Sequence, residues 1–319
     1  MLALLNHDPP RLVRDYPRPQ RGAGEARLRM RLAGVCDTDL QLMRGYLGYR
    51  GVLGHEVVAD VIESDEPGWR GRRVVADINA GCGRCAECER HHGHHCSTRT
   101  VLGIVGRDGA LAEELVVPER CLVAVPDSVP DERAVFAEPL AAALHVLDAI
   151  PAGFAGPAVV LGDGKLGLLI VCALSARGLS VTVVGHHPDK LALGRRFGAH
   201  CLLESELDRA AEQAPLVVEA TGSAGGLALA LALTAPRGTV VLKTTVAGRL
   251  EVDLAPIVVN ELCVVGSRCG DLASAVNALG AGLDPSPLVV ARYPLSKADQ
   301  ALAHACQKGV LKVVVEGAP

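Results

Sequence analysis

The sequence predicts an α/β protein with two domains, one β-rich and one built on a doubly wound parallel sheet. Three observations lead to this prediction. Short apolar runs separated by turn residues fill the first third of the 319-residue chain. From about residue 157, buried strands alternate with helices, as they do around a parallel sheet covered on both faces. After about residue 280 this alternation ends, so the β-rich domain should comprise both ends of the chain.

In the β-rich part, apolar and polar residues alternate as in half-buried antiparallel strands. Strands are predicted at residues 25–35, 55–64, 72–78 and 110–120. A helical stretch follows at 132–150, and Pro139 should bend or restart it because proline lacks a backbone N–H. The last segment, 297–316, predicts one helix and a closing strand.

The doubly wound part repeats strand, turn and helix. Its strands are predicted at 157–162, 180–185, 216–222 and 238–245, and its helices at 165–178 and 187–199. We therefore predict a β-rich domain of residues 1–140 and 285–319. The remaining residues, 141–284, are predicted to form the doubly wound domain.

The composition is typical of a soluble globular protein, with 49% hydrophobic residues, 21% charged residues and a net charge of −4. This charge favours binding neither to nucleic acid nor to an anionic membrane. The apolar start "MLALL" is too short for a signal peptide or a membrane span, so we expect a cytoplasmic protein. Eleven cysteines in such a chain indicate metal thiolates and buried thiols rather than disulfides.

The segment "VVLGDGKLGLLI" has Gly162, Gly164 and Gly167 in G-x-G-x-x-G spacing, between a predicted strand and a predicted helix. The first glycine allows a tight turn, the second lets a pyrophosphate approach the backbone, and the third lets helix and strand pack closely. The phosphates would lie at the helix N-terminus, around Lys165 and Leu166. An ordinary strand–helix turn is the alternative, but the flanking elements favour an NAD(P) site.

The second strand of the doubly wound domain ends at Gly185, where NAD-binding proteins usually have an Asp or Glu that binds the ribose 2′-hydroxyl. Without that carboxylate a 2′-phosphate is not repelled, and His186, His187 and Lys190 could pair with it. The sequence therefore favours NADP over NAD. Alternatively, the histidines are solvated loop residues and either cofactor fits.

The segment "GCGRCAECERHHGHHC" (81–96) predicts a metal centre. Its cysteines have the spacing C-x2-C-x2-C-x7-C and are Cys82, Cys85, Cys88 and Cys96. Four thiolates close a tetrahedron around Zn²⁺ and leave no position for water or substrate, so the predicted role is structural. An iron–sulfur cluster is the alternative, but the spacing differs from that of ferredoxins, and Ser97 rather than proline follows the last cysteine.

A second set of ligand-type residues is scattered along the chain and consists of Cys36, His55, Glu56 and Glu138. Taken singly, each has an ordinary explanation, as a core thiol, a buried strand histidine or a charge near a helix start. Taken together, they offer one soft ligand and three harder ones. This combination suits a Zn²⁺ ion with one position left for water or substrate.

These motifs together resemble the zinc-dependent medium-chain alcohol dehydrogenases, over almost the whole chain and in the same order. The matching segments are "GVCDTDL", "GHE", the four-cysteine segment, "EPLA", "VLGDGKLG" and "VVEATGS". The Glu138-Pro139 pair is similar to the polyol, sugar and threonine dehydrogenase branch. The resemblance implies a GroES-like β-rich catalytic domain, a Rossmann NAD(P)-binding domain, two zinc ions per chain, and a homodimer or homotetramer.

The resemblance also implies roles for single residues at the catalytic zinc. Cys36 and His55 would bind the ion, and Glu138, Glu56 or a water molecule would complete its ligands. Asp39 would be a buried acid that supports the site. These assignments follow from the resemblance, whereas the residues alone leave the ligand set open.

On the substrate side, Thr38 would take the proton of the alcohol, as implied by the same resemblance. The onward relay differs from that of the liver-type enzymes, because Gln41 stands where they have a histidine. Beside the cofactor, the resemblance places a strand end and one arginine, namely Glu219, Ala220, Thr221, Gly222 and Arg268.

We therefore expect an oxidoreductase that transfers a hydride between an alcohol and NAD(P) and forms an aldehyde or ketone. The alcohol would be a secondary alcohol, a polyol or a sugar-like compound, and Zn²⁺ would make its oxygen easier to deprotonate. Two other functions explain less of the sequence. A zinc-ribbon binding protein leaves the glycine loop, His55 and Glu138 unexplained. A catalytically silent relative, serving as a binding or structural protein, would not need to retain the catalytic zinc ligands.

Overall fold

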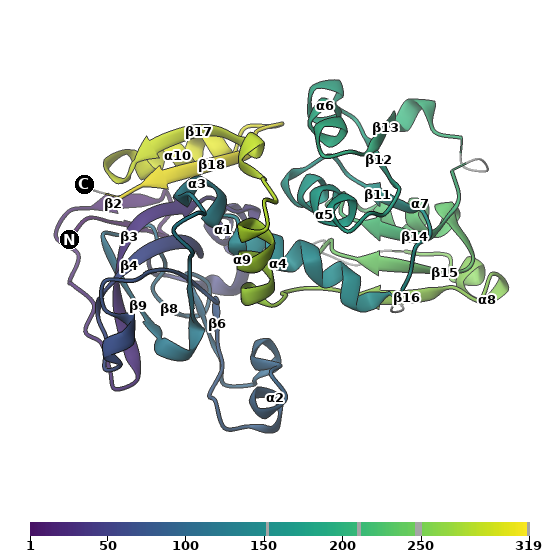
Figure 1. The fold of residues 1–319 in the computed structure, drawn as a ribbon. Coiled ribbons are helices and arrows are strands. Elements are labelled where there is room, and N and C mark those ends of the chain that lie inside the picture. The colour runs from purple at the N-terminus through teal and green to yellow at the C-terminus, as the bar shows by residue number, and fades with distance from the viewer. Residues whose placement is uncertain (151–152, 209–211, 246–250, 318–319) are drawn as a thin grey trace. The chain divides into compact units, whose positions relative to one another are not determined.

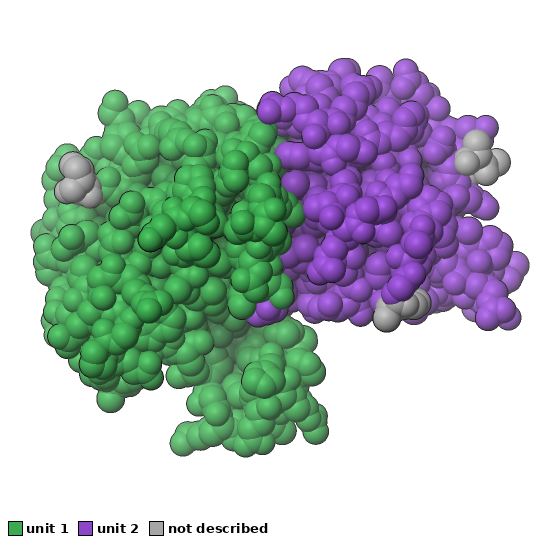
Figure 2. Space-filling view, viewed as in Figure 1, with its two compact units in different colours: residues 1–138, 272–319 green, residues 139–271 purple. Residues whose placement is uncertain are grey.

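The structure is a computed structural model and describes residues 1–150, 153–208, 212–245 and 251–317. The chain forms two compact units, Met1–Glu138 with Leu272–Pro319 and Pro139–Asp271, shown in green and purple in Figure 2. Each unit has its own sheet and its own hydrophobic core. The domain limits predicted from the sequence differ from these units mainly at the second junction, and they stay a prediction.

Pro139–Asp271 contains a six-stranded sheet with the order β13-β12-β11-β14-β15-β16 (Figure 1). All neighbouring strands in it are parallel. The strands are β11 (Ala158–Leu161), β12 (Val181–Gly185), β13 (His200–Leu203), β14 (Ala214–Glu219), β15 (Thr234–Leu242) and β16 (Cys263–Gly266). The strand order reverses between β11 and β14, and sheets of this kind bind ligands outside the carboxyl ends of the strands at such a point.

Helices connect these strands, as the sequence predicts for a doubly wound fold. They are α5 (Lys165–Ala176), α6 (Pro188–Arg196), α7 (Gly226–Leu233) and α8 (Ala255–Val259). The run Gly167–Leu174 of α5 is buried throughout, since its sequence is apolar on every side. Gly178, at φ 80°, lies just past the end of α5 in a left-handed conformation that glycine adopts without strain.

The other unit contains a seven-stranded sheet with the order β10-β5-β4-β3-β18-β17, in which β9 also pairs with β3. Its strands are β3 (Glu25–Gly34), β4 (Glu56–Glu63), β5 (Arg73–Ala76), β9 (Glu114–Pro118), β10 (Leu122–Ala124), β17 (Val289–Pro294) and β18 (Lys312–Glu316). The closing strand β18 is antiparallel to β3, with Val314 opposite Gly34. The two ends of the chain therefore share one sheet, as the sequence predicts.

Short helices and a hairpin complete this unit. They are β1 (Ala3–Leu5), β2 (Arg11–Val13), α1 (Asp37–Met43), α3 (Asp131–Ala134), α9 (Leu272–Gly280) and α10 (Ala298–Ala305). Single 3₁₀ turns occur in both units, at η1 (Tyr46–Gly48), η2 (Pro67–Trp69), η4 (Glu119–Cys121), η6 (Glu204–Glu206), η7 (Ser286–Leu288) and η8 (Leu295–Lys297). Among the described residues, none of the helices has the length and apolar character needed to cross a membrane.

The helical stretch predicted at 132–150 is divided into three pieces. These are α3, α4 (Ala137–Leu144) and η5 (His145–Ala149). The break falls at Val135–Phe136, ahead of Pro139. Pro139 itself lies in the first turn of α4, where a backbone N–H has no partner inside the helix, so proline is tolerated there. The predicted restart is confirmed.

The cysteine-rich segment forms a small lobe that protrudes from its own unit (Figures 1 and 2). A three-stranded sheet forms the base of this lobe, from β6 (Asn79–Ala80), β7 (Thr100–Leu102) and β8 (Gly106–Arg107). The outer part holds two short helices, α2 (Ala86–Glu89) and η3 (Gly93–His95). Elements this short bury little apolar surface, so the lobe needs another source of stability.

Candidate active site

Cys36, His55 and Glu56 lie together in the β-rich unit. One ligand atom from each lies within 4.8 Å of the others. Cys36 is the N-cap residue of α1, just after β3, and the other two residues lie at the start of β4. Because β3 and β4 are antiparallel with Gly34 opposite Glu56, the end of one strand meets the start of the other. The register of the sheet thus assembles this cluster.

The carboxylate of Asp39 connects the two segments that carry Cys36 and His55. Its Oδ2 accepts a hydrogen bond from the Cys36 N–H at 2.9 Å, and its Oδ1 accepts one from the Gly54 N–H at 3.1 Å. The same Oδ1 lies 3.3 Å from His55 Nδ1, and Asp39 is fully buried. Burial opposes the charge on Asp39, but His55 and the N–H donors outweigh it and lower the pKa of this carboxyl. Ionised Asp39 therefore places a negative charge beside the imidazole, whose Nδ1 has no hydrogen-bond partner in the described part of the chain.

Glu56 also pairs with a residue that the sequence analysis missed. Lys312, in β18, donates a hydrogen bond from Nζ to Glu56 Oε2 at 2.5 Å, and both side chains are almost fully buried. The ammonium lies 5.6 Å from the centre of the Phe136 ring. A Cβ at Gly34 would lie 2.0 Å from Glu56 Oε2, so this glycine makes room for the pair. The one signal in the sequence was a lysine at the start of the apolar run "KVVVE".

Glu138 lies near this cluster but outside the group of ligand atoms within 4.8 Å. Burial is the main cause that raises the pKa of Glu138 to about 7. The charge of His55 lowers this pKa, whereas the charge of Glu56 raises it. Thr38 lies beside Cys36, with its Oγ1 3.8 Å from Cys36 Sγ. The structure thus places Glu56, rather than Glu138, directly with Cys36 and His55.

The residues of the cluster fit a zinc ion. A thiol, an imidazole and a carboxylate are the three kinds of ligand that Zn²⁺ takes in proteins. Glu56 Oε1 is buried without a hydrogen-bond partner in the described part of the chain. Such an atom is costly unless a cation or donor satisfies it. Three protein ligands would leave a position for water or substrate, as in catalytic zinc sites.

The four cysteines of the lobe also meet. Their Sγ atoms all lie within 4.8 Å of one another, and they are Cys82, Cys85, Cys88 and Cys96. Cys96 Sγ accepts a hydrogen bond from the Cys82 N–H at 3.4 Å and lies 3.5 Å from Thr98 Oγ1. Thr98, with the Cys82 N–H, lowers the pKa of the Cys96 thiol to about 6. A thiolate among four clustered sulfurs fits a closed zinc site.

The glycine-rich turn of the parallel sheet has the geometry expected of a dinucleotide site. A Cβ at Gly162 would lie 2.5 Å from the Ala220 carbonyl oxygen, and one at Gly167 would lie 2.0 Å from the Gly162 carbonyl oxygen. A Cβ at Gly164, by contrast, would meet no described atom within 4 Å. Gly162 and Gly167 therefore allow close packing of the backbone. Gly164 leaves open space at the N-terminus of α5, where a pyrophosphate could lie.

The other residues predicted to bind the cofactor lie at the carboxyl ends of the same strands or in the helices that follow them. Lys165 and Leu166 begin α5, and Gly185 ends β12. After β14, Glu219 accepts hydrogen bonds from Thr221 N–H at 2.8 Å and Thr221 Oγ1 at 2.6 Å, which fixes the turn. The remaining residues in this group are His186, His187, Lys190, Gly222 and Arg268, of which Arg268 follows β16.

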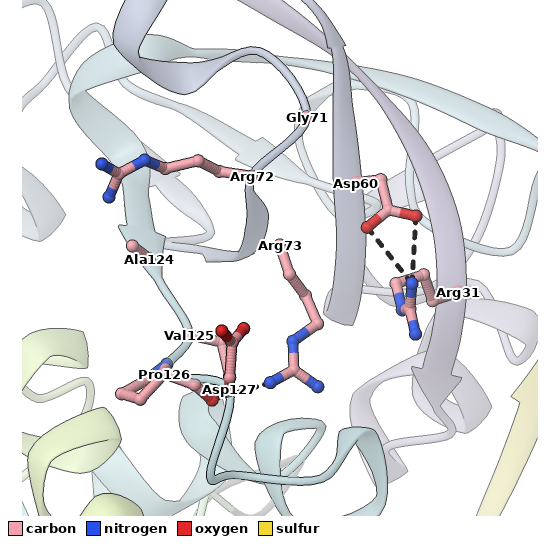
Figure 3. Close-up of a pocket in the computed structure, with 9 residues that line it drawn as sticks. All are labelled: Arg31, Asp60, Gly71, Arg72, Arg73, Ala124, Val125, Pro126 and Asp127. Atoms are coloured by element: carbon pink, nitrogen blue, oxygen red, sulfur yellow. Dashed lines mark hydrogen bonds and ion pairs between the residues drawn. The ribbon is translucent and has the colours of Figure 1, made fainter.

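A pocket of about 750 Å³ lies elsewhere in the β-rich unit (Figure 3). Of its charged residues, Arg31 pairs with Asp60, and Arg31 and Arg73 both pair with Asp131, which lies outside the lining. None of the residues predicted to bind zinc or cofactor lines it. This pocket is therefore separate from the candidate active site.

Comparisons with known protein families identify both parts of the chain. Residues 22–127 match the alcohol dehydrogenase GroES-like domain, and residues 166–281 match the zinc-binding dehydrogenase domain. The matches define an oxidoreductase of the zinc-type dehydrogenase class. The chain belongs to the zinc-dependent medium-chain dehydrogenase/reductase family, and the predicted GroES-like and Rossmann domains are confirmed.

Among curated relatives, D-altritol 5-dehydrogenase of Agrobacterium fabrum is 30% identical over 77% of this chain and 77% of that enzyme. Erythritol/L-threitol dehydrogenase of Mycolicibacterium smegmatis is 33% identical over 57% of this chain, and the match spans 56% of that enzyme. These relatives act on polyols, according to their names.

Solved structures resemble the chain over nearly its whole length. A short chain alcohol dehydrogenase of Escherichia coli CFT073, complexed with NADH, has a TM-score of 0.90 and 26% identity and covers 99% of each chain. A putative zinc-binding dehydrogenase of Sinorhizobium meliloti 1021, bound to NADP, has a TM-score of 0.88 and 25% identity, covering 99% of this chain and 98% of that one. The fold therefore accommodates either cofactor.

Proposed function

We propose that the protein oxidises an alcohol to an aldehyde or ketone with NAD(P), and catalyses the reverse reduction. A secondary alcohol, a polyol or a sugar-like compound is the proposed substrate, and the polyol dehydrogenases among the relatives support this class. The observation that carries the proposal is the grouping of Cys36, His55 and Glu56 within 4.8 Å, in a chain that also has the open glycine turn.

Each residue of the cluster has a proposed role. Cys36 and His55, with Glu56 or Glu138, would hold a zinc ion, and the negative charge of Asp39 beside His55 would help to orient the imidazole. When bound, zinc supplies a Lewis acid that favours loss of the alcohol proton, and NAD(P) supplies the hydride acceptor.

The remaining steps belong to side chains of this protein. Thr38, beside Cys36, would receive the alcohol proton at Oγ1 and release it towards water. Lys312 neutralises Glu56, so that the buried carboxylate does not stand as an uncompensated charge. The four-cysteine lobe would hold a second zinc ion with a structural role.

We also propose that the protein forms a homodimer or homotetramer and acts in the cytoplasm. The family resemblance supports the oligomer. None of the eleven cysteines, all of which lie in the described part of the chain, forms a disulfide, which suits a reducing compartment such as the cytoplasm. A catalytically silent relative is the second function considered, but the residues at the candidate zinc site give no support to it.

A substrate screen with a matched pair of variants tests the proposal. Purified protein would be assayed for zinc content and for cofactor reduction with a panel of alcohols, polyols and sugars. We expect two zinc ions per chain and activity with at least one polyol or secondary alcohol. Cys36→Ser should lose one zinc ion and at least about 100-fold in kcat, whereas Cys306→Ser, at an exposed thiol, should change neither. Full turnover by Cys36→Ser would exclude the assignment.

A further inference from the structure

Asp163 lies where the usual ribose-binding carboxylate of a dinucleotide site is missing from this sequence. It is the middle residue of the Gly162-Asp163-Gly164 turn, and its side chain reaches the end of β12. A Cβ at Gly185 would lie 2.6 Å from Cβ, Cγ and Oδ2 of Asp163. The carboxyl group of Asp163 therefore occupies the space in which a side chain on Gly185 would begin.

Hydrogen bonds fix Asp163 in this position. Its Oδ2 accepts from the His186 N–H at 2.9 Å, from the His187 N–H at 2.7 Å and from His187 Nδ1 at 3.0 Å. Its Oδ1 lies 3.2 Å from the same Nδ1. The side chain is only 8% exposed. A carboxylate offers about four acceptor positions, so these three donors leave room for one more, such as a ribose hydroxyl.

The basic residues that could hold a 2′-phosphate already face carboxylates or are buried. His187 is paired with Asp163 at 3.0 Å, and His186 Nε2 lies 3.1 Å from Glu204 Oε2. Lys190 is buried in α6, with 8% of its surface exposed. The end of β12 therefore presents two carboxylates next to its two histidines. A doubly charged phosphate would approach like charges there.

We propose that Asp163 replaces the missing acid at Gly185, binds the ribose 2′-hydroxyl and makes the protein select NAD over NADP. In sites of this fold, an acid at the end of the second strand bonds that hydroxyl, and here the acid comes from the glycine turn instead. The same carboxylate repels a 2′-phosphate, because like charges in contact disfavour binding. The inference rests on the proposed NAD(P)-dependent function and opposes the preference for NADP expected from Gly185 alone.

Cofactor binding without substrate tests this inference directly. The zinc-loaded protein would be titrated with NADH and with NADPH, and each dissociation constant obtained from the cofactor's fluorescence. We expect NADH to bind at least 10-fold more tightly than NADPH. Asp163→Asn keeps the shape but removes the charge, and it should weaken NADH binding and reduce the preference at least 10-fold. Glu261→Gln, at an exposed ion pair with Arg237 in the same unit, is the matched control and should change the ratio less than 3-fold.

A second variant covers the case in which Asp163→Asn does not fold. Asp163→Gly combined with Gly185→Asp moves the carboxylate to the strand end, and it should retain tighter binding of NADH. Equal or tighter binding of NADPH by the unmodified protein would overturn the inference, and so would an unchanged ratio in Asp163→Asn. Binding of neither cofactor would instead contradict the proposed function itself, so the two failures are distinguishable.

Discussion

Lys312 and Glu56 form a buried ion pair that joins the last strand of the chain to the start of β4, with Nζ 2.5 Å from Oε2. The two residues are 256 positions apart in the sequence. Glu56 is at the same time one of the three residues grouped as metal ligands. The pair therefore couples the stability of the β-rich unit to the charge of its candidate zinc site.

Removing one member of this pair should destabilise the protein strongly. In the zinc-free protein, Lys312→Met leaves Glu56 as an uncompensated buried charge, and we expect the free energy of unfolding of that form to fall by about 3–5 kcal/mol. Denaturant unfolding followed by circular dichroism measures this loss. Lys312→Arg, which keeps the positive charge, is the matched control, and its free energy of unfolding should fall much less. Adding Glu56→Gln to Lys312→Met should recover part of the stability. Unaltered unfolding of Lys312→Met would show that the pair contributes nothing.

The cysteine lobe should depend on its metal for stability. Cys85→Ser removes one of four clustered thiols, and we expect one zinc ion to be lost and the free energy of unfolding to fall by about 3 kcal/mol, because bound metal stabilises the folded state. Zinc analysis and thermal unfolding are the measurements. Cys306→Ser, at an exposed cysteine, should match the unmodified protein in both. A Cys85→Ser protein with two zinc ions and normal stability would rule out the structural zinc site.

Substitutions at two glycines of the Gly162–Gly167 turn should affect cofactor binding and protein stability separately. Gly164→Ala places a methyl group in open space, so the fold should be unchanged while cofactor affinity falls at least 10-fold, because the pyrophosphate can no longer approach the backbone. Gly167→Ala would place its Cβ 2.0 Å from the Gly162 carbonyl oxygen and should lower stability itself. Cofactor titration and thermal unfolding of both variants distinguish the two effects. Normal affinity in Gly164→Ala would contradict the pyrophosphate assignment.

Asp163 should give the protein a pH-dependent contribution to stability. Burial alone would raise the pKa of Asp163, but hydrogen bonds from His187 and the His186 N–H outweigh it and lower that pKa. The ionised group therefore stabilises the fold above its unfolded-state pKa of about 3.9, and this contribution is lost as the pH falls through the lower folded-state value. At about pH 6 to 7, Asp163→Asn should be less stable by about 1 kcal/mol.

The pH series itself is the decisive measurement. Denaturant unfolding of the unmodified protein and of Asp163→Asn would be compared from neutral pH down to about pH 3. The difference between them should shrink as the pH falls below about 4, because the unfolded chain then binds a proton at Asp163 while the folded carboxyl, with its lower pKa, still resists protonation. Loss of zinc in acid affects both proteins equally and cancels in the difference. A difference that stays constant over the whole range would refute the charge-based explanation.

Local patterns made much of the fold and site predictable. The G-x-G-x-x-G turn between strand and helix and the spacing of the lobe cysteines both depend on residues close together in the chain, and both predicted groupings appear in the structure. Pro139 likewise indicated the helix restart, because its effect on the backbone is local.

Features that depend on distant residues were not predictable in the same way. Lys312 meets Glu56 only through the pairing of β18 with β3, which no local pattern specifies. Asp163 reaches the end of β12 only because β11 and β12 lie side by side in the sheet. In the sequence, Gly185 at the end of β12 indicates that the usual carboxylate is absent. In the fold, Asp163, which follows the neighbouring strand β11, brings a carboxylate to that position.

The position of β18 after residues 139–271 has a consequence for biosynthesis. Residues 139–271 are complete as a unit before β18 is synthesised, so this unit can fold while β18 is still missing. The sheet that contains β3 must wait for its final strand, and with it for Lys312. A chain that stops before β18 would thus have residues 139–271 folded but the edge of β3 unpaired, and such an exposed strand edge favours aggregation.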